Sequence, residues 1–390
     1  MPAASLAGLP IARYRHPMAC DEPLSGVWVE SVAPLVELIR DEIAAAAGGR
    51  ITFARFMERA LTEPGLGYYA TSDERPTRAG DFLTAPELHP LFGRCLGRQL
   101  TQVWERLGSP TICVVREWGA GRGELARSVR DGLRADSSRL AEAVDWQPVD
   151  LPARHPGVAG SVEGVILANE YLDALPVHRV AWRDGRLLER YVTWRGGWFD
   201  WVDDEPSTPL LAAHLQADGV ALSEGQLAEI CLAAPRWVME ASGQLERGVL
   251  LIIDYGHPAG DLYGPRRLAG SLVTYREHAA GVDPFRAVGR QDITAHVDVT
   301  ALELAAAAAG LTALGSTSQA LFLAGLGLGD LLSDLGRDPA TGARTYLDAR
   351  ASVARLLDPR HLGGFRVLAF GRDIRAEPGL LGFSVHLERP

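Results

Sequence analysis

A glycine-rich turn between Gly119 and Gly123 is the segment of this chain whose residue types and spacing indicate chemistry most directly. It reads GAGRG and follows a short run of β-favouring residues, Ile112–Arg116. Glycine at alternate positions lets a turn be tight and lets a ligand approach the backbone without interference from Cβ atoms. The helix predicted to follow would direct its first N–H groups at that ligand. A GxGxG turn alone is weak evidence, because a plain structural turn explains it equally well.

Acidic residues on both sides of the turn limit which ligand it can hold. Glu117 precedes the turn and Glu124 follows it. The third glycine, Gly123, comes one position earlier than in the GxGxxG turn that binds dinucleotides. A pyrophosphate at the start of the helix would be repelled by these carboxylates. S-adenosylmethionine carries an ammonium and a sulfonium group, so the charge pattern favours it over NAD.

A second polar group follows another predicted strand, Val165–Ala168. Asn169, Glu170 and Asp173 come directly after this apolar run. In an open α/β sheet, ligands bind at the carboxyl ends of the strands, so these side chains are expected beside the glycine turn. Glu170 and Asp173 could hold a cationic acceptor and take its proton, which is the work of a general base. The structural alternative is that they cap the next helix.

Two further segments are expected to contribute to the same site. Thr84 and Glu87 have the spacing of a capping box, in which side chain and backbone cap each other at the start of a helix. This leaves Asp81, earlier in the same loop, without a structural explanation. Asp254 follows a third predicted strand, Val249–Ile253, and is therefore expected at the same edge of the sheet.

Strands that alternate with helices indicate a parallel α/β sheet around these groups. Apolar spacing and capping signals predict helices over residues 32–47, 53–61, 86–107, 124–135, 298–309 and 318–335. Residues 186–201 alternate around Gly196 and Gly197, which predicts an antiparallel hairpin. Residues 365–370 and 382–387 are predicted to be two closing strands.

These elements suggest four regions. Residues 1–30 form an N-terminal arm, and residues 31–110 a helical region with a loop that covers the cofactor. Residues 111–180 and 245–390 form the core. Residues 181–244 form an insertion of a hairpin and helices. The tryptophans of the hairpin could form an acceptor or dimer surface, or pack in the insertion's own core.

Composition excludes several classes of protein. The 39 basic and 49 acidic residues give a net charge of −10, which argues against a nucleic-acid partner. The four cysteines are widely spaced and suggest neither a zinc site nor disulfides. No metal is therefore expected. Apolar runs are too short to cross a membrane, and no signal peptide is evident, so a cytoplasmic protein is expected.

Five segments together resemble the MidA-like methyltransferases, a family that includes the mitochondrial complex I assembly methyltransferase. They are residues 65–93, 117–125, 169–180, 251–257 and 291–302, in the family's order, within a resemblance that covers about residues 50–372. The resemblance implies a class I methyltransferase fold: a Rossmann-like α/β parallel sheet with an antiparallel C-terminal strand, a helical N-terminal region and an inserted smaller region. It also implies S-adenosylmethionine as cofactor.

The resemblance also implies roles for individual residues. Those expected around the cofactor are Gly80, Asp81, Thr84, Glu117, Gly119, Gly121, Gly123 and Asn169. Glu170 and Asp173 would face the acceptor, which for the mitochondrial member is an arginine of a respiratory-complex subunit. The expected partner is accordingly a protein or peptide, and a homodimer is left open.

The sequence departs from the family after the first core helix. Related enzymes hold the ribose hydroxyls with an acidic residue at the end of the second strand, but no β-type run is evident here. With 46 positions between Gly123 and Asn169, the second strand is expected to be very short or lost. Asp136 is then the best candidate for the ribose contact.

Three functions remain in order of preference. The first is transfer of a methyl group from S-adenosylmethionine to a protein nitrogen, with arginine as the expected acceptor. The second is a non-catalytic assembly or scaffold relative with an eroded cofactor pocket, suggested by the shortened segment 124–165. The third is a methyltransferase for a small molecule or peptide in a biosynthetic pathway, because fold and cofactor do not determine the acceptor.

Overall fold

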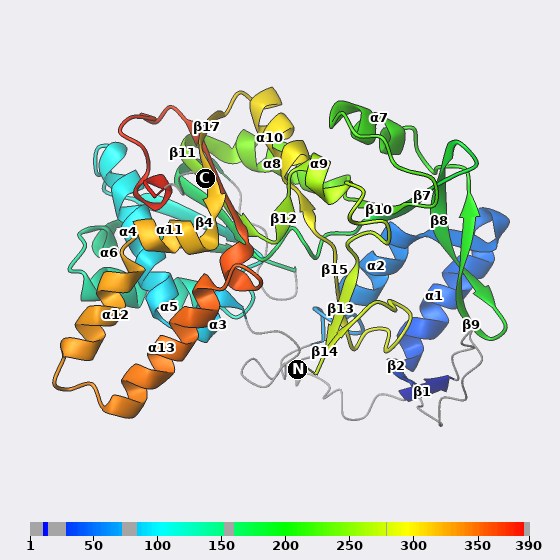
Figure 1. The fold of residues 1–390 in the computed structure, drawn as a ribbon, viewed down its shortest axis with the longest axis horizontal. Coiled ribbons are helices and arrows are strands. Elements are labelled where there is room, and N and C mark those ends of the chain that lie inside the picture. The colour runs from blue at the N-terminus through cyan, green and yellow to red at the C-terminus, as the bar shows by residue number, and fades with distance from the viewer. Residues whose placement is uncertain (1–10, 15–28, 72–83, 152–159, 278, 386–390) are drawn as a thin grey trace. The chain divides into compact units, whose positions relative to one another are not determined.

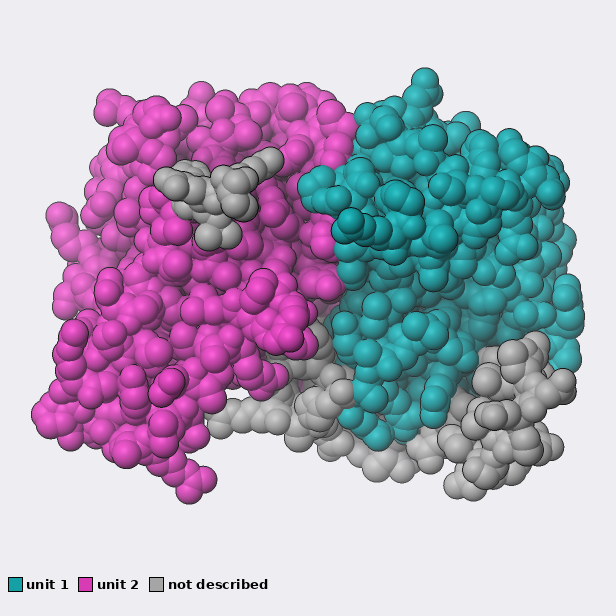
Figure 2. Space-filling model, in the orientation of Figure 1, with its two compact units in different colours: residues 1–82, 174–233, 258–298 teal, residues 83–173, 234–257, 299–390 magenta. Residues whose placement is uncertain are grey.

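The computed structural model describes residues 11–14, 29–71, 84–151, 160–277 and 279–385, in two compact units (Figure 2). Unit 1 comprises residues 1–82, 174–233 and 258–298, and unit 2 comprises residues 83–173, 234–257 and 299–390. This division differs from the expected regions. Residues 31–71 and parts of 258–298 group with the insertion, because described apolar side chains from these segments share one core with it. The expected arm lies largely outside the described residues, apart from β1 (Ile11–Tyr14), which pairs antiparallel with β2 (Val29–Val32).

A six-stranded sheet forms the centre of unit 2 (Figure 1). Its strands, in spatial order, are β17 (Thr312–Ser318), β18 (Arg366–Arg372), β11 (Leu245–Asp254), β6 (Val162–Asn169), β4 (Cys113–Trp118) and β5 (Val144–Val149). Strands β11, β6, β4 and β5 run parallel, and β18 runs antiparallel to its neighbours β11 and β17. The expected α/β parallel sheet with an antiparallel C-terminal strand is confirmed.

Helices cover this sheet and explain the apolar character of its central strands. Both Val165 and its neighbour Ile166 in β6 are buried, as are Leu251 and Ile252 in β11, because both faces of a parallel sheet are covered. The helices of unit 2 are α3 (Ala85–Leu88), α4 (Leu91–Arg106), α5 (Glu124–Ala135), α6 (Leu140–Ala143), α8 (Ala233–Gln244), α10 (Val299–Ala308), α11 (Gln319–Gly325), α12 (Leu328–Arg337) and α13 (Ala343–Leu357).

Helices α4 and α5 cross at very short range. A Cβ atom on Gly132 of α5 would lie 2.5 Å from the Cα of Arg94 in α4, and one on Gly93 of α4 would collide with Ser128. Glycine at these positions therefore sets the separation of the two helices. Burial at this crossing raises the pKa of Cys95 to about 12, so its thiol stays protonated.

Strand β5 corrects the expectation that the second strand is very short or lost. It spans six residues and pairs with β4 along its whole length. Pro148 obscured it in the sequence, because proline has no N–H to donate to a β-ladder. In the structure β5 is the edge strand of the sheet, where proline is tolerated.

Other boundaries also differ from the predicted ones. The helix predicted over 86–107 is two helices, α3 and α4, separated by His89 and Pro90. The strand predicted over 382–387 is wrong in its described part, where Leu381–Phe383 is a short 3-10 helix. Strand β17 was not predicted, because its side chains are partly or fully exposed and show no alternation.

Unit 1 is built around an antiparallel sheet. Its main path is β10 (Leu227–Ile230), β7 (His178–Arg183), β8 (Arg186–Arg195) and β3 (Arg50–Thr52), and β9 (Trp198–Asp204) pairs with β8. The predicted hairpin is confirmed as β8 and β9. The remaining elements with described bounds are α1 (Ala33–Ala45), α2 (Phe53–Thr62), α7 (Leu210–Ala217), α9 (Ala259–Leu262), β13 (Val273–Arg276), β14 (Ala279–Gly281), β15 (Asp292–Thr294) and β16 (Val297–Asp298), together with β12 (Gly256–His257) of unit 2.

An aromatic core holds unit 1 together and accounts for the hairpin tryptophans. Trp198 is 2% exposed, and the ring of Trp201 lies 4.7 Å from that of Phe285 and 5.2 Å from that of Phe53. Trp194 packs against the same core. The structure thus favours packing in the unit's own core over a dimer surface for these side chains. None of the described helices is both long enough and apolar enough to span a membrane.

Candidate active site at the carboxyl edge of the parallel sheet

The glycine turn follows β4 directly and needs glycine at each of its three positions. Gly119, Gly121 and Gly123 have φ values of 73°, 54° and 76°, in the left-handed region that favours glycine. A Cβ atom on Gly119 would lie 2.9 Å from the Tyr171 ring. On Gly121 the nearest atom would be the Gly119 carbonyl oxygen, 3.9 Å away, so this side of the turn is open to a ligand. Gly123 is the N-cap residue of α5.

Strand β5 anchors this turn. The backbone N–H groups of Gly119 and Ala120 donate to the Val149 carbonyl at 2.9 and 3.2 Å. The N–H of Gly121 donates to Oδ2 of Asp150 at 2.9 Å, and Asp150 comes directly after the end of β5. Asp150 was missed in the sequence, because its strand was not recognised. The signal that could have found it is the alternation of Val144 and Trp146 before an acidic residue.

Asp136, the residue expected at the ribose, does not lie at this edge. It is the C-cap residue of α5, a 12-residue helix that carries the chain roughly 18 Å away from the glycine turn. Arg94 and Arg98 bind its carboxylate, with N···O distances of 2.5 and 3.0 Å. Burial of the Asp136 carboxyl opposes ionisation, but hydrogen bonds from the two arginines outweigh it and lower the pKa. Asp136 therefore lies away from the edge at which the ribose contact is expected, whereas Asp150 comes directly after the second strand and contacts the turn.

Glu117 places a buried carboxyl beneath the turn. Its side chain is 4% exposed and accepts a hydrogen bond of 2.7 Å from the indole N–H of Trp146. Burial, helped by the charges of Glu124 and Asp150, raises the pKa of Glu117 to about 7 against the effect of this hydrogen bond. Three carboxyl groups thus surround the turn within electrostatic range. This charge distribution suits a cation and disfavours a pyrophosphate.

Glu170 follows β6 in a strained backbone conformation. Its φ of 52° lies in the left-handed region, which costs a non-glycine residue of the order of 1 kcal/mol. Its Oε1 accepts hydrogen bonds from the Ala85 backbone N–H at 3.0 Å and from Nδ2 of Asn169 at 3.1 Å. Burial raises the pKa of Glu170 to about 8, and the charges of Asp254 and Glu87 add to this effect. The carboxyl can therefore exist in both protonation states near neutral pH.

Asp254 holds the turn that carries Glu170 and Asp173. It ends β11, is 2% exposed, and its Oδ2 accepts hydrogen bonds from the N–H groups of Tyr171 at 3.1 Å and Leu172 at 2.7 Å. Burial raises the pKa of Asp254 to about 6, although its backbone hydrogen bonds oppose the shift. The expectation that Asp254 lies at the same edge agrees with these contacts.

The predicted capping box is confirmed and lies against the same group. Thr84 and Glu87 cap α3, with the Thr84 N–H donating to Oε2 of Glu87 at 3.2 Å. The first N–H of this helix is the one that donates to Glu170. Gly80 and Asp81, from the preceding loop, lie outside the described residues.

An aromatic group that the sequence did not reveal borders the turn. The ring of Tyr171 lies 6.0 Å from that of Trp118 and 5.7 Å from that of Trp237. The indole nitrogens of both tryptophans are buried without a hydrogen-bond partner. So is Oδ1 of Asn169. Buried polar atoms in native proteins are nearly always paired, so these three indicate positions at which a ligand completes the hydrogen bonding.

The described residues fit S-adenosylmethionine. The turn offers an open face at Gly121, a carboxyl group beneath it, and an acidic residue at the end of the neighbouring strand. The structure brings together Thr84, Glu117, Gly119, Gly121, Gly123, Asn169, Glu170 and Asp173 at the carboxyl ends of β4, β6 and β11, while Asp136 lies elsewhere. Ligands of open α/β sheets bind at this edge.

Known proteins resemble this chain in both sequence and structure. Residues 129–317 match a family model described as "Putative S-adenosyl-L-methionine-dependent methyltransferase". A crystal structure from Burkholderia thailandensis with bound S-adenosyl-homocysteine has a TM-score of 0.80 and 36% sequence identity, and the match covers 90% of this chain and 95% of that one. A native structure of a protein from the same organism matches with a TM-score of 0.75 and 35% identity over 90% and 94% of the two chains.

Proteins from animals are also similar to this chain in sequence. The Drosophila melanogaster protein arginine methyltransferase NDUFAF7 homolog is 29% identical over 322 residues, which are 70% of this chain and 71% of the relative. The human protein arginine methyltransferase NDUFAF7 is 26% identical over 390 residues, 85% of this chain and 82% of the relative. Both are named as mitochondrial proteins, which contradicts the expected cytoplasmic location.

These matches decide between the enzyme and the non-catalytic relative that the sequence left open. The eroded pocket of a scaffold relative was suggested by a lost second strand, and β5 is present. The protein is an enzyme, its cofactor is S-adenosylmethionine, and its fold is that of the class I methyltransferases. From the glycine turn, its anchoring strand and these relatives together, the chain belongs to the MidA-like family of S-adenosylmethionine-dependent methyltransferases.

Proposed function

We propose that this enzyme methylates an arginine nitrogen of a protein, with Glu170 and Asp173 at the acceptor. In the same proposal, Thr84, Glu117, Gly119, Gly121, Gly123 and Asn169 contact the cofactor, together with Gly80 and Asp81. Asp150 takes the ribose role first expected of Asp136. The relatives named as protein arginine methyltransferases support this choice of acceptor.

The carboxyl group of Glu170 is the observation that carries the proposal. It is held by the start of α3 and by Asn169, and both hydrogen bonds end on Oε1. Its pKa of about 8, raised by burial, lies close to the pH at which a general base works best. A guanidinium group placed between Glu170 and Asp173 would favour the ionised carboxylates and would be oriented by them.

The proposed reaction follows from these placements. S-adenosylmethionine supplies an electrophilic methyl group, so that the S–CH₃ bond breaks as the N–CH₃ bond forms and S-adenosylhomocysteine is released. Glu170 accepts the proton that the guanidinium nitrogen loses, and Asp173 keeps the planar group in position. Asp254 fixes the turn that carries both side chains through its bonds to Tyr171 and Leu172. Catalysis then comes mainly from positioning of the two reactants.

The substitution Glu170→Gln tests this role. We expect it to reduce methyl transfer by about 100-fold or more, the range for loss of a general base, with cofactor affinity within about threefold of the parent. Glu163→Gln is the matched control, because Glu163 starts the same strand and forms an ion pair with Arg247. Transfer is measured from S-adenosylmethionine labelled at its methyl group, and affinity by calorimetry.

The acceptor is identified in the same assay. A lysate is incubated with the enzyme and labelled cofactor, its protein is hydrolysed, and the amino acids are separated. Label in methylated arginine supports the proposal. Label in methylated lysine, or in the small-molecule fraction, would assign a different acceptor. Full turnover by Glu170→Gln would remove Glu170 from the acceptor site.

A further inference from the structure

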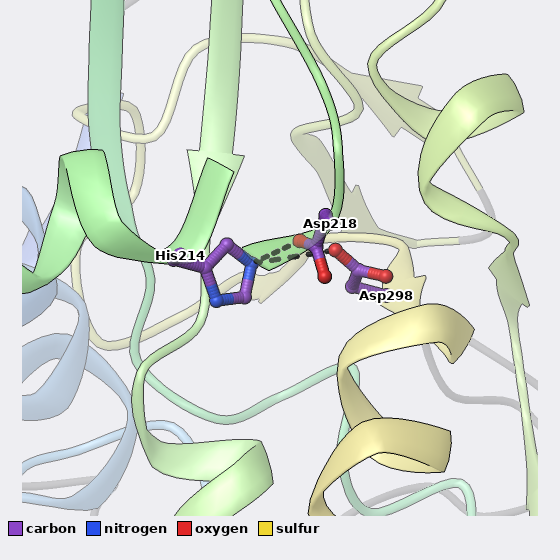
Figure 3. A group of neighbouring side chains, drawn as sticks. All are labelled: His214, Asp218 and Asp298. Atoms are coloured by element: carbon purple, nitrogen blue, oxygen red, sulfur yellow. Dashed lines mark ion pairs between the residues drawn. The ribbon is translucent and has the colours of Figure 1, made fainter. Parts of the chain in front are cut away.

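A compact polar group in unit 1 consists of His214, Asp218 and Asp298 (Figure 3). His214 lies on α7, and Asp218 is the C-cap residue of the same helix, one turn further on. Asp298 ends β16, 80 positions further along the chain, directly before α10. Nε2 of His214 lies 3.1 Å from Oδ2 of Asp218 and 3.3 Å from Oδ2 of Asp298. Figure 3 shows the imidazole directed at both carboxylates.

The group is almost completely removed from solvent. The side chains of His214, Asp218 and Asp298 are 8%, 1% and 7% exposed. The contact of 3.1 Å between His214 and Oδ2 of Asp218 is an ion pair without hydrogen-bond geometry, so this buried oxygen has no hydrogen-bond donor among the described residues. A buried carboxylate oxygen without a donor is costly, because it has lost its water and gained no hydrogen bond.

The two carboxylates of this group favour the binding of a cation. Both carboxylates approach the same nitrogen of His214, and both side chains are almost fully buried. The hydroxyl of Tyr263 lies 3.3 Å from Nε2 of His214 and donates to the Glu229 carbonyl at 3.4 Å. Two adjacent buried carboxyl groups therefore share one imidazole.

We propose that His214, Asp218 and Asp298 bind one divalent metal ion of the zinc type. The three ligand atoms lie within 4.8 Å of one another. Four ligands about 2.1 Å from a tetrahedral zinc ion lie roughly 3.4 Å apart, close to the His–Asp distances here. One imidazole nitrogen with two carboxylate oxygens suits zinc or a neighbouring transition metal, whereas calcium takes six to eight oxygen ligands.

The bound metal would stabilise the folded state of unit 1. It joins the end of α7 to the end of β16. These two ends are 80 residues apart in sequence, and the segment between them includes β10, an edge strand of the antiparallel sheet. Closing a long loop restricts the unfolded chain, so binding at this position is expected to raise the stability of the folded state. The fourth coordination position is available to water.

The test uses the full chain, freed of metal by a chelator and then titrated with zinc sulfate. We expect one zinc ion per chain, counted by mass spectrometry of the metal after gel filtration. We also expect Tm to rise by about 3 °C when free zinc exceeds the Kd 100-fold. Binding of no zinc at 100 μM, chosen as roughly the upper end of physiological relevance, would overturn the proposal and leave a shared proton as the counter-ion.

The substitution Asp218→Asn separates a metal site from a merely structural cluster. Its Tm without zinc should equal or exceed that of the parent, because the amide removes the repulsion between the two carboxylates. The bound zinc and the zinc-dependent rise in Tm should both be lost. His214→Gln should also lose the zinc, with His361→Gln as the control for an exposed histidine. A variant that keeps one zinc ion after Asp218→Asn would show that the ion binds elsewhere.

Discussion

Residue types at the glycine turn determine the charge of the ligand that can bind. Glu117, Glu124 and Asp150 lie within electrostatic range of one another around three glycines in the left-handed region. Glycine-rich turns of this kind bind different ligands in different proteins, so the glycines alone do not identify the ligand. The carboxyl groups supply it, because they favour a ligand that carries positive charge and exclude one that carries phosphate.

Gly121 offers the most direct test at this scale. Gly121→Val should weaken S-adenosylmethionine binding by about 100-fold or more, because its side chain would fill the open face of the turn. Left-handed strain should cost about 1–2 kcal/mol of folding stability, which leaves the protein folded. Gly108→Val is the matched control: Gly108 also has a positive φ, 89°, and open space around it, at the end of α4. Unchanged cofactor affinity in Gly121→Val, measured by calorimetry, would remove the turn from the site.

Helix packing sets the shape of the site at the scale of elements. Strand β5 anchors the turn from one side. Helix α5 begins at the turn and packs so closely against α4 that the contact positions have no room for a Cβ atom. The turn therefore depends on an edge strand and on a helix crossing, neither of which contacts the reacting atoms. Both are positioned by packing over the whole length of the elements.

Substitution of Gly132 tests the helix crossing. Gly132→Ala should destabilise the protein by about 1–3 kcal/mol, because the added methyl group would meet the backbone of Arg94. Gly243→Ala is the matched control, since Gly243 is in α8 and has nothing within 4 Å of its Cβ position. Alanine should stabilise that helix by up to about 1 kcal/mol. Thermal unfolding of the two variants should shift in opposite directions; equal shifts would contradict the close packing described here.

At the scale of the whole molecule, the buried carboxyls link folding stability to pH. Their pKa values in the folded state are about 7 for Glu117, 8 for Glu170 and 6 for Asp254, all raised chiefly by burial. A carboxyl with a raised pKa binds its proton more tightly in the folded state than in the unfolded state. Stability is therefore highest below the unfolded-state pKa and falls as the pH rises towards the folded-state pKa.

The free energy of unfolding should consequently fall between about pH 5 and pH 8 in the absence of cofactor. Glu117→Gln should remove up to about 3 kcal/mol of this fall, because burial raises the pKa of Glu117 to about 7, well above the usual value for glutamate. Glu163→Gln, at a partly exposed carboxyl, should leave the profile as it is. The measurement is urea unfolding of parent and variants at several pH values. A parent profile that rises across this range would contradict the assigned shifts.

The sequence by itself determined the family and the cofactor, and it predicted which polar residues follow the parallel strands. Glycine spacing, flanking carboxylates and the groups after each buried strand are local patterns, and the order of parallel strands brings strand ends together. Most helices and the hairpin followed from local periodicity and capping residues. These features were predictable because each depends on residues that are close in sequence.

Only the tertiary structure decided how distant segments combine. It placed Asp150 at the glycine turn and Asp136 at the far end of α5. The sequence did not predict this arrangement, because the edge strand before Asp150 contains Pro148 and has too weak a local pattern to be recognised. It also joined His214 and Asp218 to Asp298 across 80 residues. Burial raises the pKa values of Glu117 and Glu170, and burial is a property of packing that no single segment of sequence contains.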